Sequence, residues 1–320
     1  MRIEYHSIDK LSEFAERPDV LGVITYGTVP RWTGKAPVAA LSLRPEGPAL
    51  CEVIQGAQAM YGQDRGVCYG HDGQWLFATI TVREPGGLRA AAMDAYRDIL
   101  AVIGSLGYPC LIRAWQYFPD IHVCEEGLER YRQFNKGRHQ AFEPYFAQGG
   151  LRPAATCIGG AGPGLSIYVL AQKSPGVAIE NPRQMAAYRY PVVYGPQAPD
   201  FVRAMKVEAH EGALLWISGT AAIVGHESQG IGDFDRQVQE TFANLDAVLA
   251  RADLGPHPEI MATKIYVRKP QSLKEVPAPW RQSATVILEG DICRAELDIE
   301  VEAVVREDPL RITALRTAGS

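Results

Sequence analysis

The chain repeats one arrangement of secondary structure, and this repeat limits its possible folds more than any other feature. In the first copy, the apolar run 75–82 predicts a strand, 88–105 an amphipathic helix, and 110–117 a second strand. In the second copy, 213–218, 234–252 and 260–268 follow in the same order. A Gly/Pro-containing break follows each helix. An offset of roughly 150 residues indicates a duplication, or two domains of similar fold.

The length supports the same division. A chain of 320 residues is long for one domain and fits two domains of roughly 150 residues each. The glycine- and proline-containing segment 148–153 is the expected linker. We therefore expect domains at 1–150 and 151–320, in an α+β fold with mixed sheets and helices packed on one face of each. The second half carries more unusual residues, so we expect it to be catalytic and the first half structural.

Composition excludes several classes of protein. The net charge is −5 and no basic block is present, which argues against a nucleic-acid surface. No apolar run approaches the roughly 20 residues of a membrane span, and the start of the chain lacks a signal-peptide core. Six cysteines and seven histidines are dispersed without a Cys-x-x-Cys pair or histidine clustering, which predicts reduced thiols and no metal. We expect a cytoplasmic protein without a cofactor, as a monomer or small homo-oligomer.

The segment 290–300 combines a thiol, an arginine and four acids with apolar alternation. In a strand, Asp298, Glu300 and Glu302 would share one face, because side chains alternate. One interpretation is an amphipathic strand with a solvated acidic face. The other is that repulsion and burial raise the pKa of one carboxyl group, which then acts as an acid in a pocket.

Several blocks in one order resemble the chorismatase family, which removes pyruvate from chorismate. The resemblance extends from about residue 75 to 305 and rests on the segments 129–138, 180–191, 217–228, 262–268 and 290–300. It implies two tandem domains similar to the Rid-type (chorismate-mutase-like) fold, with the active site in the C-terminal one. It also implies chorismate as the small-molecule substrate.

The resemblance implies catalytic roles for Glu300 and Cys293. The family's essential glutamate, which protonates the enolpyruvyl methylene, corresponds to Glu300. In members that form 3-hydroxybenzoate, a cysteine lies seven residues earlier, as Cys293 does. Seven is an odd number, so an unbroken strand would put the two side chains on opposite faces. We therefore expect a bulge, bend or turn near 294–296.

A dianionic substrate requires cations, and arginine binds carboxylates with a bidentate fork. The candidate substrate-binding residues are Arg268, Tyr266, Arg281, Arg183, Tyr188 and Tyr190. All except Arg281 have a structural alternative: a solvated strand face for Tyr266 and Arg268, a turn cap for Arg183, and core packing for Tyr188 and Tyr190. Backbone at Gly219, Thr220 and Ala221 could approach the ligand closely. The resemblance implies that a small residue near this segment distinguishes product types.

The leading hypothesis is a chorismatase that forms 3-hydroxybenzoate and pyruvate. Within enzymes, the alternatives are hydrolysis to 3,4-dihydroxycyclohexa-1,5-diene carboxylate and mixed formation of 3- and 4-hydroxybenzoate. A different class is a Rid-like imine deaminase or a non-catalytic metabolite-binding protein. A pyruvate assay separates this class from the leading hypothesis.

Overall fold

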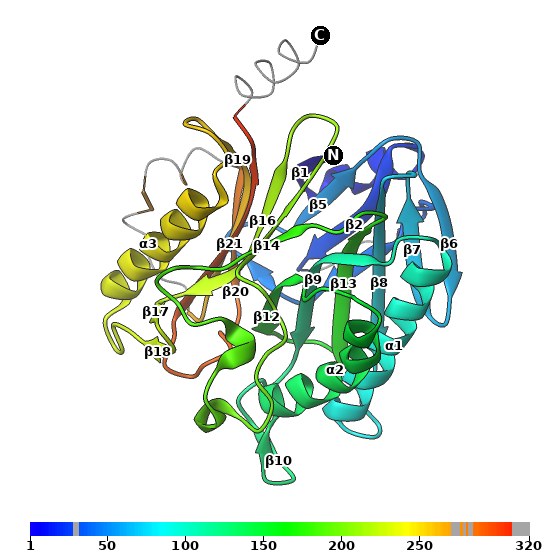
Figure 1. Ribbon diagram of the computed structural model, residues 1–320. Coiled ribbons are helices and arrows are strands. Elements are labelled where there is room, and N and C mark those ends of the chain that lie inside the picture. Colours follow the sequence, from blue (N-terminus) through cyan, green and yellow to red (C-terminus); the bar gives the residue numbers. More distant parts are fainter. Residues whose placement is uncertain (28–31, 270–275, 278–279, 281–283, 309–320) are drawn as a thin grey trace.

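A computed structural model describes residues 1–27, 32–269, 276–277, 280 and 284–308. Three larger sheets and three long helices make up this part of the chain (Figure 1). The α+β class with mixed sheets is confirmed.

The first large sheet has six strands in the order β12-β9-β13-β8-β7-β6. In chain order its strands are β6 (Met60–Asp64), β7 (Val67–His71), β8 (Trp75–Val82), β9 (Cys110–Phe118), β12 (Ala154–Gly159) and β13 (Leu165–Gln172). Helices α1 (Leu88–Ser105) and α2 (Arg130–Ala147) pack together over one face (Figure 1).

The second large sheet has seven strands in the order β14-β15-β16-β21-β19-β20-β4. Its strands are β4 (Arg44–Pro45), β14 (Val177–Ile179), β15 (Ala204–Val207), β16 (Leu214–Ala221), β19 (Glu259–Val267), β20 (Ala284–Glu289) and β21 (Ile299–Arg306). Helix α3 (Phe234–Ala252) covers one face. It begins where the Asp233 carboxylate accepts a hydrogen bond from the Arg236 backbone N–H, which satisfies a donor at the first turn.

The first residues form a third sheet of four strands in the order β1-β5-β2-β3. These are β1 (Arg2–Ser7), β2 (Val20–Tyr26), β3 (Val38–Leu41) and β5 (Leu50–Gln55). The smaller elements are the hairpins β10 (Cys124–Glu125)/β11 (Leu128–Glu129) and β17 (Ile223–Val224)/β18 (Glu227–Ser228), and the 3₁₀ turns η1 (Ile8–Phe14), η2 (Ala187–Arg189) and η3 (Val192–Tyr194).

The two copies of the predicted repeat are present, but the sheets do not divide at residue 150. Helices α1 and α3 have the predicted bounds, and β8 does as well. However, β12 pairs with β9, and β13 lies between β9 and β8. The segment up to Gln172 is therefore part of the first sheet, and the expected boundary at 150/151 cuts through it. The local hydrophobic pattern predicts that a segment forms a strand, but it does not predict which other strand that segment pairs with.

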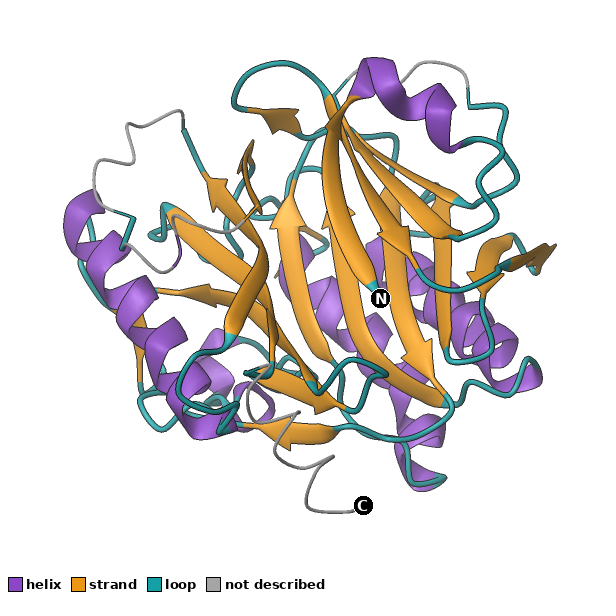
Figure 2. Cartoon of the chain, turned by 90° about the horizontal axis from the view of Figure 1, so that it is seen from above, coloured by secondary structure: helices purple, strands orange, loops and turns teal. Residues whose placement is uncertain are grey.

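The three sheets pack face to face around one interior core (Figure 2). Trp75 and Trp115 of the first large sheet contact Trp216 of the second edge-on, each with ring centroids 6.0 Å apart. All three indoles are at most 2% exposed. The helices lie on the outside, and only the inner sheet faces meet.

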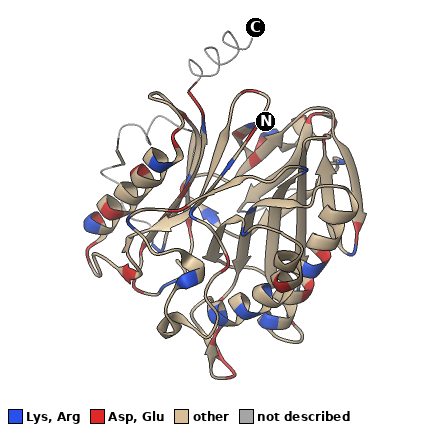
Figure 3. Cartoon of the chain, in the orientation of Figure 1, with Lys and Arg blue, Asp and Glu red and all other residues tan. Residues whose placement is uncertain are grey.

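Charged residues of both signs are interspersed along the helices (Figure 3). Within the described part of the chain, no helix has the length and hydrophobicity to cross a bilayer.

Candidate active site

A cavity of about 360 Å³ opens between the start of α2, the segment between β14 and β15, and the second large sheet, within the range typical of small-molecule pockets. The first turn of α2 contributes Glu129, Tyr131 and Arg132. The segment between β14 and β15 contributes Tyr190, Val193, Tyr194, Pro199, Phe201 and Arg203. The second sheet and its neighbouring loops contribute Gly219, Ala221, Ile223, Glu300 and the turn residues 293–296. Both halves of the repeat therefore form the wall.

Glu300 is the most deeply buried of the three carboxyl groups that line this cavity. It lies on β21, is 4% exposed, and has no hydrogen-bond partner among the described residues. Burial and then the nearby Glu302 carboxylate raise its pKa to about 8, while Arg113 and Arg203 partly oppose this. At neutral pH the carboxyl group therefore carries a proton, which a general acid requires.

Glu302 lies two residues further along the same strand face but has a different environment. Its carboxylate accepts hydrogen bonds from Arg113 Nη2 at 2.8 Å, Trp115 Nε1 at 2.7 Å and the Thr156 hydroxyl, and lies 3.2 Å from Lys264 Nζ. Burial alone would raise its pKa, but Lys264, Arg113 and the hydrogen bonds lower it. Two buried neighbouring carboxyl groups thus differ in charge. The interpretation of a solvated acidic face is therefore wrong for Glu300 and Glu302, because both are buried.

Gly219 provides the space for the Glu300 carboxyl group. It lies at a bulge in β16, where the pairing with β21 shifts between Ile217 and Thr220. A Cβ atom at this position would lie 1.9 Å from Glu300 Oε1. The Gly219 N–H donates to Thr156 Oγ1 at 2.9 Å, so it is not available to hold a substrate oxygen as the sequence suggested.

The chain between Cys293 and Glu300 is broken by a turn, as predicted. Residues 293–296 form a bend and turn, in which the Leu297 N–H donates to the Arg294 carbonyl at 3.1 Å, and β21 begins only at Ile299. Both side chains therefore reach the same cavity. Burial, followed by the Glu300 carboxylate, raises the pKa of the Cys293 thiol to about 12. The thiol stays protonated, with Tyr131 as a hydrogen-bond partner.

Two arginines line the cavity with unused hydrogen-bond donors. Arg203 is 2% exposed; its Nη2 donates to the Tyr190 hydroxyl at 2.7 Å and to a backbone carbonyl, but its Nε has no partner. Arg294 stacks on the Tyr194 ring at 4.0 Å and donates through Nη1 to the His226 carbonyl at 2.9 Å, but its Nη2 has no partner. Both guanidinium groups bring positive charge to the wall of the cavity, which favours an anionic ligand.

Comparison with known proteins identifies the family. Residues 52–171 match the family model described as "Chorismatase FkbO/Hyg5-like, N-terminal". A 3-hydroxybenzoate synthase from Streptomyces hygroscopicus is 33% identical over 90% of this chain and 92% of its own. A chorismatase from the same organism is 32% identical over 89% of each chain. A crystal structure of a chorismatase covers 95% of this chain and 97% of its own, with 30% identity and a TM-score of 0.84.

The chain belongs to the chorismatase family. Of the eleven site residues predicted from sequence, five line the cavity of this chorismatase: Glu300, Cys293, Tyr190, Gly219 and Ala221. Within the described residues, no group of three or more His, Cys, Asp or Glu side chains is placed to hold a metal ion.

Arg268 and Tyr266 have structural positions in this chorismatase. The Arg268 guanidinium donates to the carbonyls of Leu297 and Arg294 at 2.8–3.1 Å and to Asp291 Oδ1 at 2.5 Å. It therefore holds the turn from outside the cavity. Tyr266 is fully buried between the sheets, with its hydroxyl 2.8 Å from that of Tyr117. Strand alternation indicated a shared face but not that another sheet covers it.

The remaining predicted residues also lie away from the cavity. Arg183 pairs with Glu240 of α3 at 2.6 Å, and its backbone N–H is bonded by Asn181 Oδ1, which is the turn-capping alternative. Tyr188 lies against the Arg152 guanidinium at 4.5 Å. Thr220 is buried, and its hydroxyl donates to the Ser218 carbonyl. Arg281 lies outside the described residues.

The sequence reasoning missed Arg203, Arg294 and the start of α2. Arg294 directly follows Cys293, so its position beside the predicted catalytic thiol was the available signal. Arg203 precedes a four-residue strand and carries no local signal. Tyr131 and Arg132 belong to the block 129–138, which supported the family resemblance but from which no site residue was predicted.

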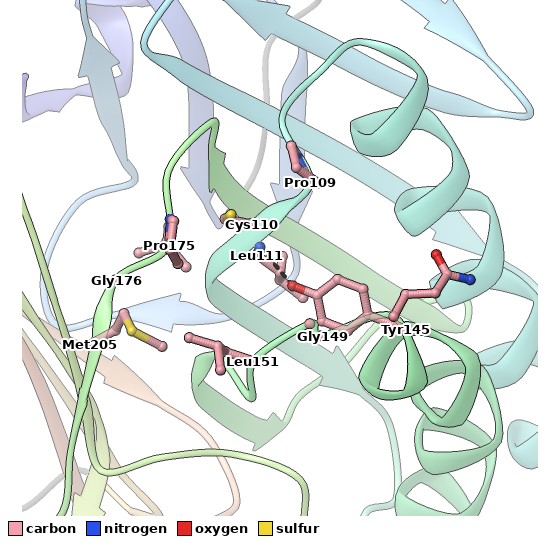
Figure 4. A pocket seen from close by; sticks show the side chains of 12 residues that line it. Pro109, Cys110, Leu111, Tyr145, Gly149, Leu151, Pro175, Gly176 and Met205 are labelled. Carbon is pink, nitrogen blue, oxygen red and sulfur yellow. Dashed lines mark hydrogen bonds between the residues drawn. The ribbon is translucent and has the colours of Figure 1, made fainter.

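A second, smaller crevice of about 210 Å³ lies between the start of β9, the end of α2, the loop before β14 and Met205 of β15 (Figure 4). Its lining includes Cys110, Tyr145, Leu151 and Met205 but no acidic or basic side chain. The Tyr145 hydroxyl already accepts a hydrogen bond from the Leu111 N–H at 3.1 Å. The crevice therefore offers neither an acid nor a cation for a dianionic substrate.

Proposed function

We propose that this chorismatase converts chorismate to 3-hydroxybenzoate and pyruvate, with Glu300 as the general acid. The observation that carries the proposal is the buried Glu300 carboxyl group, with its raised pKa, in a cavity that Arg132, Arg203 and Arg294 also line. The name of one relative, a 3-hydroxybenzoate synthase, supports the choice of product.

The first step is proton transfer from Glu300 to the terminal methylene of the enolpyruvyl group. The enol ether is inert until this carbon is protonated, and protonation gives an oxocarbenium ion. A pKa of about 8 suits this step, because the acid is protonated at neutral pH and still gives its proton readily. The resulting carboxylate then lies beside the developing positive charge and stabilises it.

The second step decides the product. If the ring hydroxyl displaces the pyruvyl group from the neighbouring ring carbon, the hydroxyl proton leaves, pyruvate departs as the ketone and an arene-oxide-like intermediate forms. Rearrangement then gives 3-hydroxybenzoate with no net consumption of water. Water attack on the oxocarbenium ion would instead give the dihydroxydiene. Cys293 adjoins Glu300 in the cavity and carries its proton, so its role is to orient the ring or exclude water rather than to act as a nucleophile.

The cations of the cavity hold the two carboxylates of chorismate. Arg203 and Arg294 line the wall beside Glu300, and Arg132 adds a third guanidinium at the α2 side. Tyr190 already binds Arg203 through its hydroxyl. This pairing fixes the plane of the guanidinium, which a bidentate contact to a carboxylate needs.

Incubation of the purified protein with chorismate tests the proposal, with pyruvate measured enzymatically and aromatic products separated by chromatography. We expect equal amounts of pyruvate and 3-hydroxybenzoate. Dihydroxydiene as the only ring product would contradict the product while leaving pyruvate removal intact. Release of ammonia from an enamine without pyruvate release from chorismate would favour a deaminase instead.

The variant Glu300→Gln tests the acid. We expect pyruvate release to fall by about 10²–10⁴-fold, with the far-ultraviolet circular dichroism spectrum unchanged. Asp298→Asn is the matched control, because Asp298 is a neighbouring carboxylate that pairs with Arg268 at 3.5 Å outside the cavity. Comparable losses in both variants would show that general damage to this segment, rather than loss of an acid, lowers the rate.

A further inference from the structure

Glu302 belongs to a chain of alternating buried charges that crosses the sheet interface. Glu52 of β5 lies 2.8 Å from Lys264 Nζ, and Lys264 Nζ lies 3.2 Å from Glu302 Oε1. At the other end, Glu302 Oε2 accepts from Arg113 Nη2 at 2.8 Å. All four side chains are at most 4% exposed. Buried charges that pair in this way cannot relax toward solvent, so each has a fixed position.

The carboxylate of Glu302 is placed beside the active-site cavity without lining it. Thr156 forms the junction: its hydroxyl donates to Glu302, while its oxygen accepts from the Gly219 N–H that borders Glu300. The strand β21 puts Glu302 and Glu300 on one face, two residues apart. A fixed negative charge thus lies next to the acid.

We infer that Glu302 is a positioning residue for the proton transfer, because its fixed negative charge keeps the neighbouring Glu300 in the proton-bearing form. This inference rests on the proposed role of Glu300 as the general acid. Glu302 touches neither the cavity nor its contents, and acts only through Glu300.

Other charged and titratable groups also face Glu300, and they limit how far its pKa changes when Glu302 is replaced. The charged side chains from other elements are Arg113, Arg203, Glu129, Arg132, Arg294 and Glu296. The uncharged titratable groups are Cys157, Cys293, Tyr131, Tyr190 and Tyr194. After burial, Glu302 has the largest influence on the pKa of Glu300, followed by Arg113 and Arg203 in the opposite direction. Removing only the Glu302 charge therefore leaves two cations acting on Glu300.

The variant Glu302→Gln removes the charge and keeps the shape of the side chain. Glu300 is active as an acid below its pKa, so activity falls as the pH rises through that value. In Glu302→Gln we expect this decline in kcat/KM to move to lower pH by about 1–3 units. At a pH above both midpoints, a shift of one unit corresponds to an approximately tenfold lower rate.

Glu52→Gln is the matched control. It removes a carboxylate from the same network, but from the far side of Lys264. We expect it to perturb stability while the pH profile stays that of the wild type. Equal shifts in Glu52→Gln and Glu302→Gln would overturn the inference, since disruption of the network rather than the adjacent charge would then explain both.

A measurement without substrate separates this inference from the proposed function. The carbonyl band of protonated Glu300, isolated as the infrared difference between wild type and Glu300→Gln, should titrate at lower pH in the Glu302→Gln background. If the band shifts but chorismate is not turned over, the proposed reaction fails and the electrostatic role stands. An unshifted band refutes the role, whatever the activity. Should Glu302→Gln not fold, the double variant Glu302→Gln/Lys264→Met removes the carboxylate with its ammonium partner, and the same downward shift is expected.

Discussion

Replacing Gly219 by alanine is the sharpest steric test of the cavity. The added Cβ would lie 1.9 Å from Glu300 Oε1 and 2.8 Å from its Cδ, whereas such atoms essentially never approach closer than 3.0 Å. The carboxyl group must therefore move by about 1 Å, and a misplacement of this size can cost about 10²-fold in rate. Gly219 has no left-handed backbone conformation, so the alanine adds no backbone strain. The effect should fall mainly on Glu300, with a smaller crowding of Thr156 Oγ1, which lies 3.1 Å from the added Cβ.

The assay is the initial rate of pyruvate release from chorismate, with thermal unfolding measured in parallel. We expect a loss of about 10²-fold and a destabilisation of about 1–3 kcal/mol from overpacking. Gly104→Ala is the control, because Gly104 lies in α1 with nothing within 4 Å of the added Cβ. That variant should keep the wild-type rate and gain up to about 1 kcal/mol in stability.

The outcome can refute the reasoning directly. If Gly219→Ala is as active as Gly104→Ala, the observed position of the Glu300 carboxyl group is not the one from which the proton is transferred. If Gly219→Ala loses both activity and folding, its refolding yield must be compared with that of Gly104→Ala before the loss of activity is attributed to Glu300.

Three further predictions concern the pH response, the thiol and the cations. Burial and Glu302 raise the pKa of Glu300 to about 8. The contribution of Glu300 to the unfolding free energy is therefore complete below about pH 4.5 and is lost as the pH rises through about 8, a loss of at most about 5 kcal/mol. The unfolding free energies of wild type and Glu300→Gln, measured in urea across this pH range, should diverge, and parallel pH dependences would contradict the raised pKa. Cys293→Ala should retain pyruvate release within about tenfold but change the ring products on chromatography, and an unchanged product mixture would remove the thiol from the second step. Arg203→Lys keeps a charge but loses the planar fork, so KM for chorismate should rise about tenfold or more; a change in kcat alone would place Arg203 in the chemical step instead.

The sequence predicted elements well where the signal is local. Helices α1 and α3 and strand β8 have the expected bounds, because amphipathic periodicity and a proline or glycine at the ends determine them. The turn between Cys293 and Glu300 followed from side-chain alternation together with the family resemblance, which implied that both side chains act in one pocket. A seven-residue separation cannot put two side chains into one pocket without a break.

The same local patterns did not predict contacts between segments that are far apart in the chain. The pairing of β12 with β9 and of β13 with β8 joins segments far apart in the chain. Alternation also indicated that Lys264 and Tyr266 share a face, but not that the other sheets bury it. The arginines of the cavity show the same limit. Arg268 was favoured from its strand, whereas Arg203 and Arg294 reach the cavity through loops whose course no periodicity determines.

The contacts of Arg268 have a consequence for how this active site can change. The guanidinium holds the turn through backbone carbonyls of Arg294 and Leu297, and any residue at those positions supplies the same acceptor. This support for the turn therefore does not depend on which side chains stand at 294 and 297. The side chains of Arg294 and Glu296 instead tie the turn to the β17/β18 hairpin, through the His226 carbonyl and the Ser228 hydroxyl. A substitution at 293 or 295 can therefore change the cavity wall while both sets of contacts retain the path of the chain.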